Sequence, residues 1–289
     1  MNIKEFKAYA ILRLKDQYEP PGLQLFISTL LQEMAEIPGH WYYTKETYVP
    51  HPEKLKSLMF AVDQAAAGKP LQYILGQVVF GGCSIKVDRR VLIPRPETEQ
   101  LWDKARRTAT GPILDACTGS GCLAVALKKE KPQVPVFAFD INPNALELAR
   151  ENAVLNKTDV CFFQADIADT DAVEAAAIRA GLKKGTTDLL VSNPPYVTEK
   201  EKEQMLHRVL AFEPAEALFV PDADPLVHYR PLALLGSRFL RPGGTLLAEV
   251  NEAYGEELRR LFVQSGYSEV LVEKDLNEKD RFIHARWVP

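Results

Sequence analysis

Four consecutive residues, Asn193-Pro194-Pro195-Tyr196, have the narrowest chemistry in this sequence. They follow the apolar run 188–191, which predicts a buried strand, so they lie where open α/β sheets bind their ligands. The prolines have no N–H group, and the motif therefore offers two acceptors, the Pro194 carbonyl and the Asn193 side-chain oxygen, beside one aromatic ring. Such a site suits a planar group whose NH2 donates two hydrogen bonds. Two prolines alone are more typical of a rigid turn, so the interpretation depends on the residues upstream.

The upstream residues are a glycine-containing loop, Cys117-Thr118-Gly119-Ser120-Gly121, between an expected strand and an expected helix. Glycines let a ligand approach the backbone closely, and they leave the N–H groups at the start of the helix free to bind it. The third glycine of the dinucleotide-binding fingerprint is missing, because position 124 is alanine. The loop thus favours a nucleotide-like cofactor without a pyrophosphate.

Acidic residues lie at the ends of the first three expected strands, as Asp115, Asp140 and Asp166. The Asp140 carboxylate can accept hydrogen bonds from both hydroxyls of a ribose, although a solvated helix N-cap is the alternative. Asp166 can accept from an adenine amino group, with Ile167 against the ring. The acidic side chain of Asp115 would repel a negatively charged pyrophosphate, so this set of residues fits S-adenosylmethionine better.

Strand and helix patterns alternate from Pro112 onward, which predicts an α/β fold with a doubly wound, mostly parallel sheet of seven strands. A short polar stretch joins the last two strands, and it predicts one antiparallel strand near the end. The expected strands are 112–116, 135–139, 160–164, 187–192, 244–250, 268–273 and 281–288. The expected helices between them are 121–130, 143–155, 171–181, 224–240 and 255–265.

Three segments are expected along the chain. Residues 1–75 have apolar positions at helical spacing and predict a small N-terminal helical domain, which either recognises a protein partner or is a structural cap. Residues 76–93 alternate around Gly81-Gly82 and predict a β-hairpin linker. Residues 94–289 form the domain that carries the motifs.

Composition excludes several classes of protein. The net charge of −4 is unlike that of a protein that binds long nucleic acids, and no direct nucleic-acid partner is expected. No apolar run is long enough for a membrane span, and the N-terminus lacks a signal-peptide core. The four cysteines have no metal-ligand spacing, so we expect no metal site and reduced thiols in a cytoplasmic protein. A monomer is expected.

Four motifs together resemble the HemK-type N5-glutamine methyltransferases. They are Gln72-Tyr73-Ile74-Leu75-Gly76, the proline-rich run 91–99, the loop 118–122 and Asn193-Pro194-Pro195-Tyr196. The resemblance covers about residues 71–250, and the proline-rich run is its most specific part. It implies a Rossmann-like class I methyltransferase that uses S-adenosylmethionine. The implied substrate is the glutamine of the Gly-Gly-Gln motif in class-1 peptide chain release factors.

The resemblance also assigns roles to residues. Asn193, Pro194 and Tyr196 are the expected catalytic residues: the first two accept the amide N–H bonds, and Tyr196 flanks the amide plane. Pro195, Arg95 and Glu97 are expected to join them around the substrate, with Thr98 beside them. The expected cofactor-binding residues are Asp115, Cys117, Thr118, Gly119, Ser120, Gly121, Asp140, Asp166, Ile167 and Asn193.

The chain departs from the family pattern at three places. Cys117 replaces the usual glycine, which puts the exact shape of the cofactor loop in doubt. Asn251 and Tyr254 stand where glycine and glutamine are more usual. The stretch 274–281 lacks the glycine expected before Asp280-Arg281. None of these departures involves the expected amide acceptors, so they affect the substrate assignment more than the chemistry.

Three other functions remain open at this stage. An adenine-N6 methyltransferase uses the same Asn-Pro-Pro-Tyr acceptors for an exocyclic NH2, but its nucleic-acid substrate conflicts with the acidic net charge. A nicotinamide-dependent dehydrogenase conflicts with the missing third glycine. A regulatory module that binds the cofactor without catalysis is the third.

Overall fold

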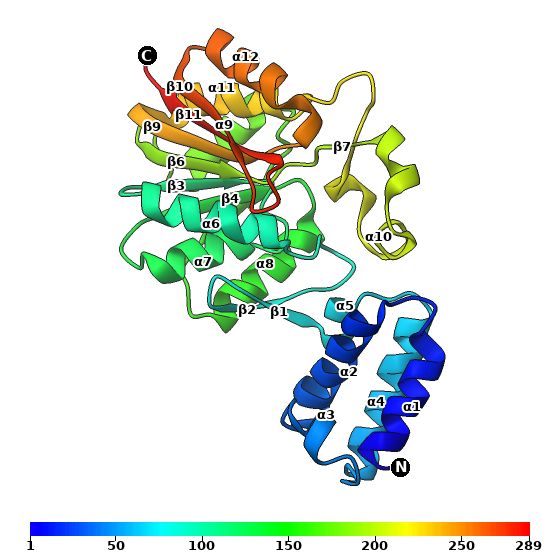
Figure 1. The fold of residues 1–289 in the computed structure, drawn as a ribbon. Helices are drawn as coiled ribbons and strands as arrows, with labels where there is room; N and C mark the ends of the chain where they lie inside the picture. The colour runs from blue at the N-terminus through cyan, green and yellow to red at the C-terminus, as the bar shows by residue number, and fades with distance from the viewer. The chain divides into compact units, whose positions relative to one another are not determined.

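The computed structural model describes all residues, 1–289, and they form two compact units. The first unit comprises Met1–Gly76 together with Leu206–Phe212, and the second comprises Gln77–Met205 together with Glu213–Pro289. Figure 1 labels the elements of both units. All helices fall short of the combined length and apolarity that a membrane crossing requires.

The first unit is entirely helical, as expected for the N-terminal region. Apolar residues at helical spacing form its core, for example the fully buried Ile3, Phe6, Ala10 and Leu14. Asn2 and Glu5 form a capping box at the start of its first helix. The helices are α1 (Ile3–Leu14), α2 (Pro20–Ala35), α3 (Trp41–Thr44), α4 (Pro52–Ala66), α5 (Leu71–Leu75) and α10 (His207–Phe212).

The second unit is built on a seven-stranded sheet in the order β10-β11-β9-β6-β3-β4-β5. Only β11 runs antiparallel to its neighbours. The strands are β3 (Ile113–Ala116), β4 (Val136–Asp140), β5 (Cys161–Gln164), β6 (Thr187–Ser192), β9 (Leu240–Glu249), β10 (Tyr267–Lys274) and β11 (Asp280–Trp287). The prediction of a doubly wound, mostly parallel sheet with one antiparallel strand near the end is confirmed.

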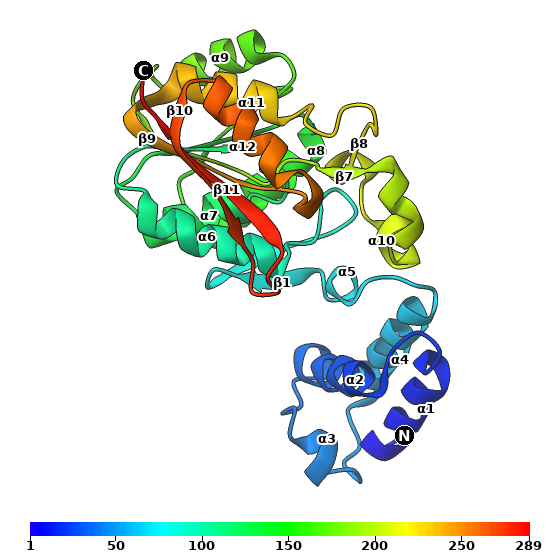
Figure 2. The ribbon, with the colours of Figure 1, turned by 45° about the horizontal axis from the view of Figure 1, so that its top comes forward.

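Helices cover both faces of this sheet (Figures 1 and 2). One face carries α6 (Pro96–Thr108), α7 (Cys122–Glu130) and α8 (Pro143–Leu155). The other face carries α9 (Thr170–Arg179), α11 (Tyr229–Phe239) and α12 (Gly255–Gln264). Because both faces are covered, every residue of the central strands β3 and β6 is buried.

Shorter elements complete the second unit. The expected hairpin contains β1 (Gln77–Phe80) and β2 (Cys83–Lys86), which pair antiparallel. A small parallel pair, β7 (Val197–Thr198) and β8 (Phe219–Val220), follows the Asn193–Tyr196 motif and was not predicted. The 3-10 turns η1 (Glu199–Gln204), η2 (Ala215–Ala217) and η3 (Glu252–Tyr254) are further additions.

Two predicted boundaries are wrong. The helix expected over 224–240 begins only at Tyr229, since Pro221 and Pro225 lie in a run of turns before it. The strand expected from residue 244 begins at Leu240, and its register with β6 shifts near the glycines at 243 and 244.

The order of the strands determines where a ligand can bind. From β3 the chain moves to β4 and then to β5 on one side, and it returns to β6 on the other side of β3. A crevice forms at the carboxyl ends of strands where the order reverses in this way. The loops after β3, β4, β5 and β6 all meet at that edge.

Candidate active site

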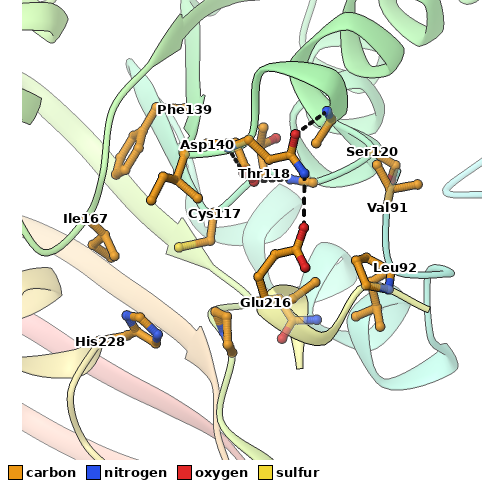
Figure 3. Close-up of a pocket in the computed structure, with 18 of the residues that line it drawn as sticks. Val91, Leu92, Cys117, Thr118, Ser120, Phe139, Asp140, Ile167, Glu216 and His228 are labelled. Carbon is orange, nitrogen blue, oxygen red and sulfur yellow. Dashed lines mark hydrogen bonds between the residues drawn. The ribbon is translucent and has the colours of Figure 1, made fainter. Parts of the chain in front are cut away.

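A cavity of about 400 Å³ lies at this edge of the sheet, within the second unit. Figure 3 shows it between the loop after β3, the ends of β4 and β5, and the segment around Glu216. Most of the predicted site residues line it. They are Cys117, Thr118, Gly119, Ser120, Asp140, Asp166, Ile167, Asn193 and Pro195.

The glycine-containing loop is shaped by three residues in the left-handed region. Cys117, Gly119 and Gly121 have φ values of 58°, 53° and 75°. A Cβ atom on Gly121 would lie 2.9 Å from the Cβ atom of Ala149, so only glycine allows α7 to pack this closely on α8. A Cβ atom on Gly119 would meet nothing within 4 Å. The loop is therefore tight behind the cavity and open toward it.

Asp140 holds this loop in place from the end of β4. Its Oδ2 accepts a hydrogen bond from the Gly119 N–H at 2.8 Å, and its Oδ1 accepts one from the Asn142 N–H at 2.9 Å. Burial raises the pKa of this carboxyl group. Each carboxylate oxygen can accept more than one hydrogen bond, so the side chain keeps acceptor capacity for a bound ligand.

The far end of the cavity is mainly apolar. Phe139 and Ile167 contribute hydrophobic side chains, and His228 lies near them in Figure 3. The His228 Nδ1 atom is buried without a partner, and burial lowers the pKa of this imidazole. Asp166 is exposed beside the cavity, where its Oδ1 accepts from the Ala168 N–H at 2.9 Å. This combination can bind a flat ring that carries polar edges.

Two side chains that we did not predict meet across the cavity. The Asn142 side-chain NH2 donates to Glu216 Oε1 at 3.2 Å, and this is the dashed line that ends at the labelled Glu216 in Figure 3. This bond joins the start of α8 to the segment between α10 and β8. It brings a second carboxylate close to Asp140, which is one reason for the raised pKa of Asp140.

Asp115 is completely buried behind the loop and does not line the cavity itself. Its Oδ2 accepts from the Thr118 hydroxyl at 2.6 Å, whereas its Oδ1 has no partner. Burial raises the pKa of this carboxyl group to about 7, although the hydrogen bond from Thr118 lowers it. Near neutral pH, the Asp115 carboxyl group is therefore partly protonated.

Asp115 therefore gives the stability of the fold a distinct pH dependence. The pKa is about 7 in the folded chain and 3.8 without burial, so the folded state holds an extra proton between these values. Its contribution to stability is complete below about pH 4 and declines as the pH rises to about 7. We expect Asp115→Asn to remove a decline of about 1.4 kcal/mol per pH unit. Urea unfolding of both proteins across this interval measures it, and parallel stability curves would contradict it.

At the other wall of the cavity, Asn193 follows directly after β6. Its side-chain NH2 donates to the Thr98 hydroxyl oxygen at 3.0 Å. No group of the protein donates to the Asn193 Oδ1 atom or to the Pro194 carbonyl. The two acceptors expected from the sequence are thus both unbonded.

Tyr196 lies behind Asn193 rather than in the cavity wall. Its hydroxyl donates to Glu249 Oε1 at 2.6 Å, and the Thr98 hydroxyl donates to Glu249 Oε2 at 2.9 Å. Burial raises the pKa of Glu249, while these two donors and the Arg281 guanidinium act in the opposite direction. The motif is therefore tied at both ends to one buried carboxyl group.

Some predicted site residues do not line the cavity: Asp115, Gly121, Pro194, Tyr196, Arg95 and Glu97. Arg95 instead donates to Glu213 at 2.7 Å, and Glu213 also accepts from the Ile93 N–H at 3.0 Å. Arg95 thus helps fix the proline-rich run, whose Pro94 does line the cavity.

Comparisons with known proteins identify the family. Residues 96–221 match the family model described as the methyltransferase small domain. A Bacteroides thetaiotaomicron protein named release factor glutamine methyltransferase is 38% identical over 285 residues, which are 96% of this chain and 98% of that protein. The chain belongs to the release factor glutamine methyltransferase family. The family resemblance drawn from the motifs is confirmed.

A further relative and one solved structure are also similar to this chain. A Flavobacterium psychrophilum protein named release factor glutamine methyltransferase is 39% identical over 222 residues, 74% of each chain. A methyltransferase from Pyrococcus furiosus has a TM-score of 0.50 at 16% identity, covering 83% of this chain and 100% of that one. This last likeness concerns the fold alone.

Two of the departures from the family pattern put larger residues where glycine is favoured. Cys117 has a φ of 58°, and Glu278, in the stretch before Asp280-Arg281, has a φ of 61°. Left-handed backbone costs a non-glycine residue about 1–2 kcal/mol. At both places the chain therefore adopts a backbone conformation that favours glycine, although the residue there has a larger side chain.

The third departure adds hydrogen bonds. Asn251 is 5% exposed, and its side-chain NH2 donates to the Tyr196 carbonyl at 3.2 Å and to the Glu201 carboxylate at 3.0 Å. Glu201 also accepts from the backbone and hydroxyl of Thr198. Asn251 thus joins the end of β9 to the segment that follows the Asn193–Tyr196 motif.

We expect Asn251→Ala to lower the free energy of unfolding by about 1–3 kcal/mol, because it removes the donor to the partly buried Tyr196 carbonyl and one of the donors to Glu201. Thermal unfolding monitored by circular dichroism measures the effect. The matched control is Asn277→Ala, since Asn277 is exposed and its side chain has no hydrogen bond. Equal melting temperatures for wild type and Asn251→Ala would show that the hydrogen bonds of the Asn251 side chain do not stabilise the fold.

Sequence reasoning missed Asn142, Glu216 and His228, which line the cavity, and Glu249, which accepts hydrogen bonds from Thr98 and Tyr196 behind it. Glu249 gave a signal, because it ends a strand at the same edge of the sheet as Asp115 and Asp140. Glu216 lies in the short 3-10 turn η2 and His228 in the turns before α11, and neither gave a signal.

Proposed function

We propose that this chain methylates the side-chain amide nitrogen of the glutamine in the Gly-Gly-Gln motif of class-1 peptide chain release factors. The observation that carries the proposal is the pair of unbonded acceptors, Asn193 Oδ1 and the Pro194 carbonyl. A primary amide has two N–H donors and matches such a pair. Membership of the release factor glutamine methyltransferase family supports the same substrate.

The cofactor of this reaction is S-adenosylmethionine, and the residues of the cavity fit it. Asp140 has spare acceptor capacity for ribose hydroxyls, and Phe139 and Ile167 offer apolar surface to a base. Asp166 adds a further acidic side chain to the cavity lining, which suits a cationic ligand. When bound, S-adenosylmethionine supplies an electrophilic methyl group on a sulfonium.

The acceptors solve the main chemical problem of the reaction. An amide nitrogen is a poor nucleophile, because its lone pair is delocalised into the carbonyl group. Asn193 Oδ1 and the Pro194 carbonyl aim the nitrogen and favour the positive charge that develops on it. Orientation of this kind contributes several of the roughly 7–11 kcal/mol available from positioning. The proton released afterwards passes to water.

The remaining assignments follow from this substrate. Pro195 forms cavity wall beside the glutamine side chain, and Tyr196 supports the motif from behind. The helical unit, residues 1–75 as expected from the sequence, contacts the release factor. Translation termination takes place in the cytoplasm, and the protein acts there as a monomer without nucleic acid.

Mass spectrometry of a purified class-1 release factor incubated with the protein and S-adenosylmethionine tests the proposal. The expected result is a gain of one methyl group that fragmentation assigns to the glutamine of Gly-Gly-Gln. A release factor with that glutamine replaced by alanine is the control and gains nothing. Methyl transfer to RNA or DNA, with none to the release factor, would overturn the proposal in favour of an adenine-N6 methyltransferase.

A further inference from the structure

Glu249 is a buried carboxylate that belongs to no assigned part of the site. It ends β9 and is only 1% exposed, and it does not line the cavity. Both of its oxygens accept hydrogen bonds, one from Tyr196 at 2.6 Å and one from Thr98 at 2.9 Å. A buried group of this kind calls for a physical role, since its burial is costly.

The direction of each hydrogen bond follows from the number of protons available. A hydroxyl has one proton to donate, and the Thr98 hydroxyl gives it to Glu249. Thr98 Oγ1 must then accept in its other contact, which is with the Asn193 side-chain NH2 at 3.0 Å. One N–H of the Asn193 NH2 is thereby bonded to Thr98, which orients the amide and leaves its oxygen for the substrate.

This chain of bonds makes the polarity of the acceptor site depend on Glu249. If Thr98 had no acceptor at Glu249, its proton could go to Asn193 Oδ1, and the amide could turn its NH2 toward the substrate. Two NH2 groups facing one another would repel rather than bind. The Tyr196 hydroxyl likewise donates its proton to Glu249, so this hydroxyl is held away from the cavity.

We propose that Glu249 is a positioning residue that fixes the hydrogen-bond polarity of the Asn193–Tyr196 motif through Thr98 and Tyr196. It touches neither the substrate nor the cofactor. Arg281 compensates its charge from nearby, held in turn by Asp275 at 3.2 Å and by the Val250 carbonyl. The proposal rests on the proposed function, because it concerns how that site selects an NH2 donor.

Glu249→Gln is the sharpest test, because it keeps the shape and replaces one acceptor by a donor. Thr98→Val interrupts the same chain at its middle, and Thr98→Ser keeps the hydroxyl. We expect Glu249→Gln and Thr98→Val each to lower kcat about 100-fold, with the KM for the cofactor within about twofold of wild type. Thr98→Ser recovers most of the activity. Glu252→Gln, the same change on an exposed side chain nearby, leaves it unchanged.

The double variant distinguishes positioning from general damage to the fold. If Glu249 acts through Thr98, Glu249→Gln combined with Thr98→Val is no worse than the poorer single variant, whereas independent defects multiply. Binding of S-adenosylhomocysteine by calorimetry verifies that each variant is folded. Should Glu249→Gln fail to bind it, the comparison of Thr98→Val with Thr98→Ser decides the matter.

The failure of this inference differs from the failure of the proposed function. Wild-type protein that leaves the Gly-Gly-Gln glutamine unmethylated contradicts the proposed function. Wild-type activity on that glutamine, together with nearly unchanged kcat in Glu249→Gln or in Thr98→Val, overturns the positioning role alone. Multiplicative losses in the double variant overturn it as well.

Discussion

Replacement of Asn193 by alanine is expected to lower kcat for release factor methylation by about 100-fold to 1,000-fold. The substitution removes one of the two unbonded acceptors and the side chain that Thr98 orients. The Pro194 carbonyl alone cannot fix the rotation of a primary amide, so the nitrogen lone pair loses its alignment with the methyl group. The Kd for S-adenosylmethionine should stay within about threefold of wild type, because Asp140 and the glycine-containing loop are unaffected.

Single-turnover kinetics and calorimetry measure these two quantities separately. Asn277→Ala is the matched control: it removes an exposed asparagine side chain far from the motif in the sequence, between β10 and β11. Asn193→Asp is a useful second variant, since its carboxylate keeps oxygen acceptors but has no NH2 to donate to Thr98. If Asn193→Ala turned over at close to the wild-type rate, Asn193 would have no role in the reaction.

The fold was largely predictable because the information is local. The central strands contain short apolar runs, as in Leu189–Val191, and a turn and a helix follow each of β3, β4 and β5. These patterns can be recognised in a single sequence, without knowledge of which residues are in contact in the fold. By contrast, α10 belongs with helices more than 130 positions away, and only contacts such as Arg208 over the Tyr18 ring reveal this. No local pattern encodes such an association.

The site was predictable to the same extent. Residues at strand ends, such as Asp140 and Asn193, were found because parallel strands bring their carboxyl ends to one edge. The bond between Thr98 and Glu249 joins positions 151 residues apart in the sequence, and Arg95 meets Glu213 across 118. Reading Arg95 as a substrate-binding residue followed from its motif, whereas its observed partner depends on a distant loop. Residues that line the cavity were thus easier to predict than residues that hold them in place.

The second large effect is expected from substitution of Asp140. It should weaken the binding of the cofactor and change kcat much less. Asp140→Ala removes the acceptor for the Gly119 and Asn142 N–H groups and, by our assignment, the acceptor for the ribose hydroxyls. Hydrogen bonds to a charged group contribute about 1.5–3 kcal/mol each. We therefore expect the Kd for S-adenosylmethionine to rise about 100-fold, measured by calorimetry, with Asp159→Ala as an exposed control.

The pattern across the two variants is more informative than either alone. At saturating S-adenosylmethionine, Asp140→Ala should recover kcat to within about tenfold of wild type, because its loss concerns binding in ground state and transition state alike. Asn193→Ala should not recover at any cofactor concentration, since its loss arises only as the methyl group is transferred. A Kd unchanged by Asp140→Ala would show that the ribose binds elsewhere. The separation of the two effects follows from the fold, because Asp140 ends β4 and Asn193 follows β6, on opposite sides of β3.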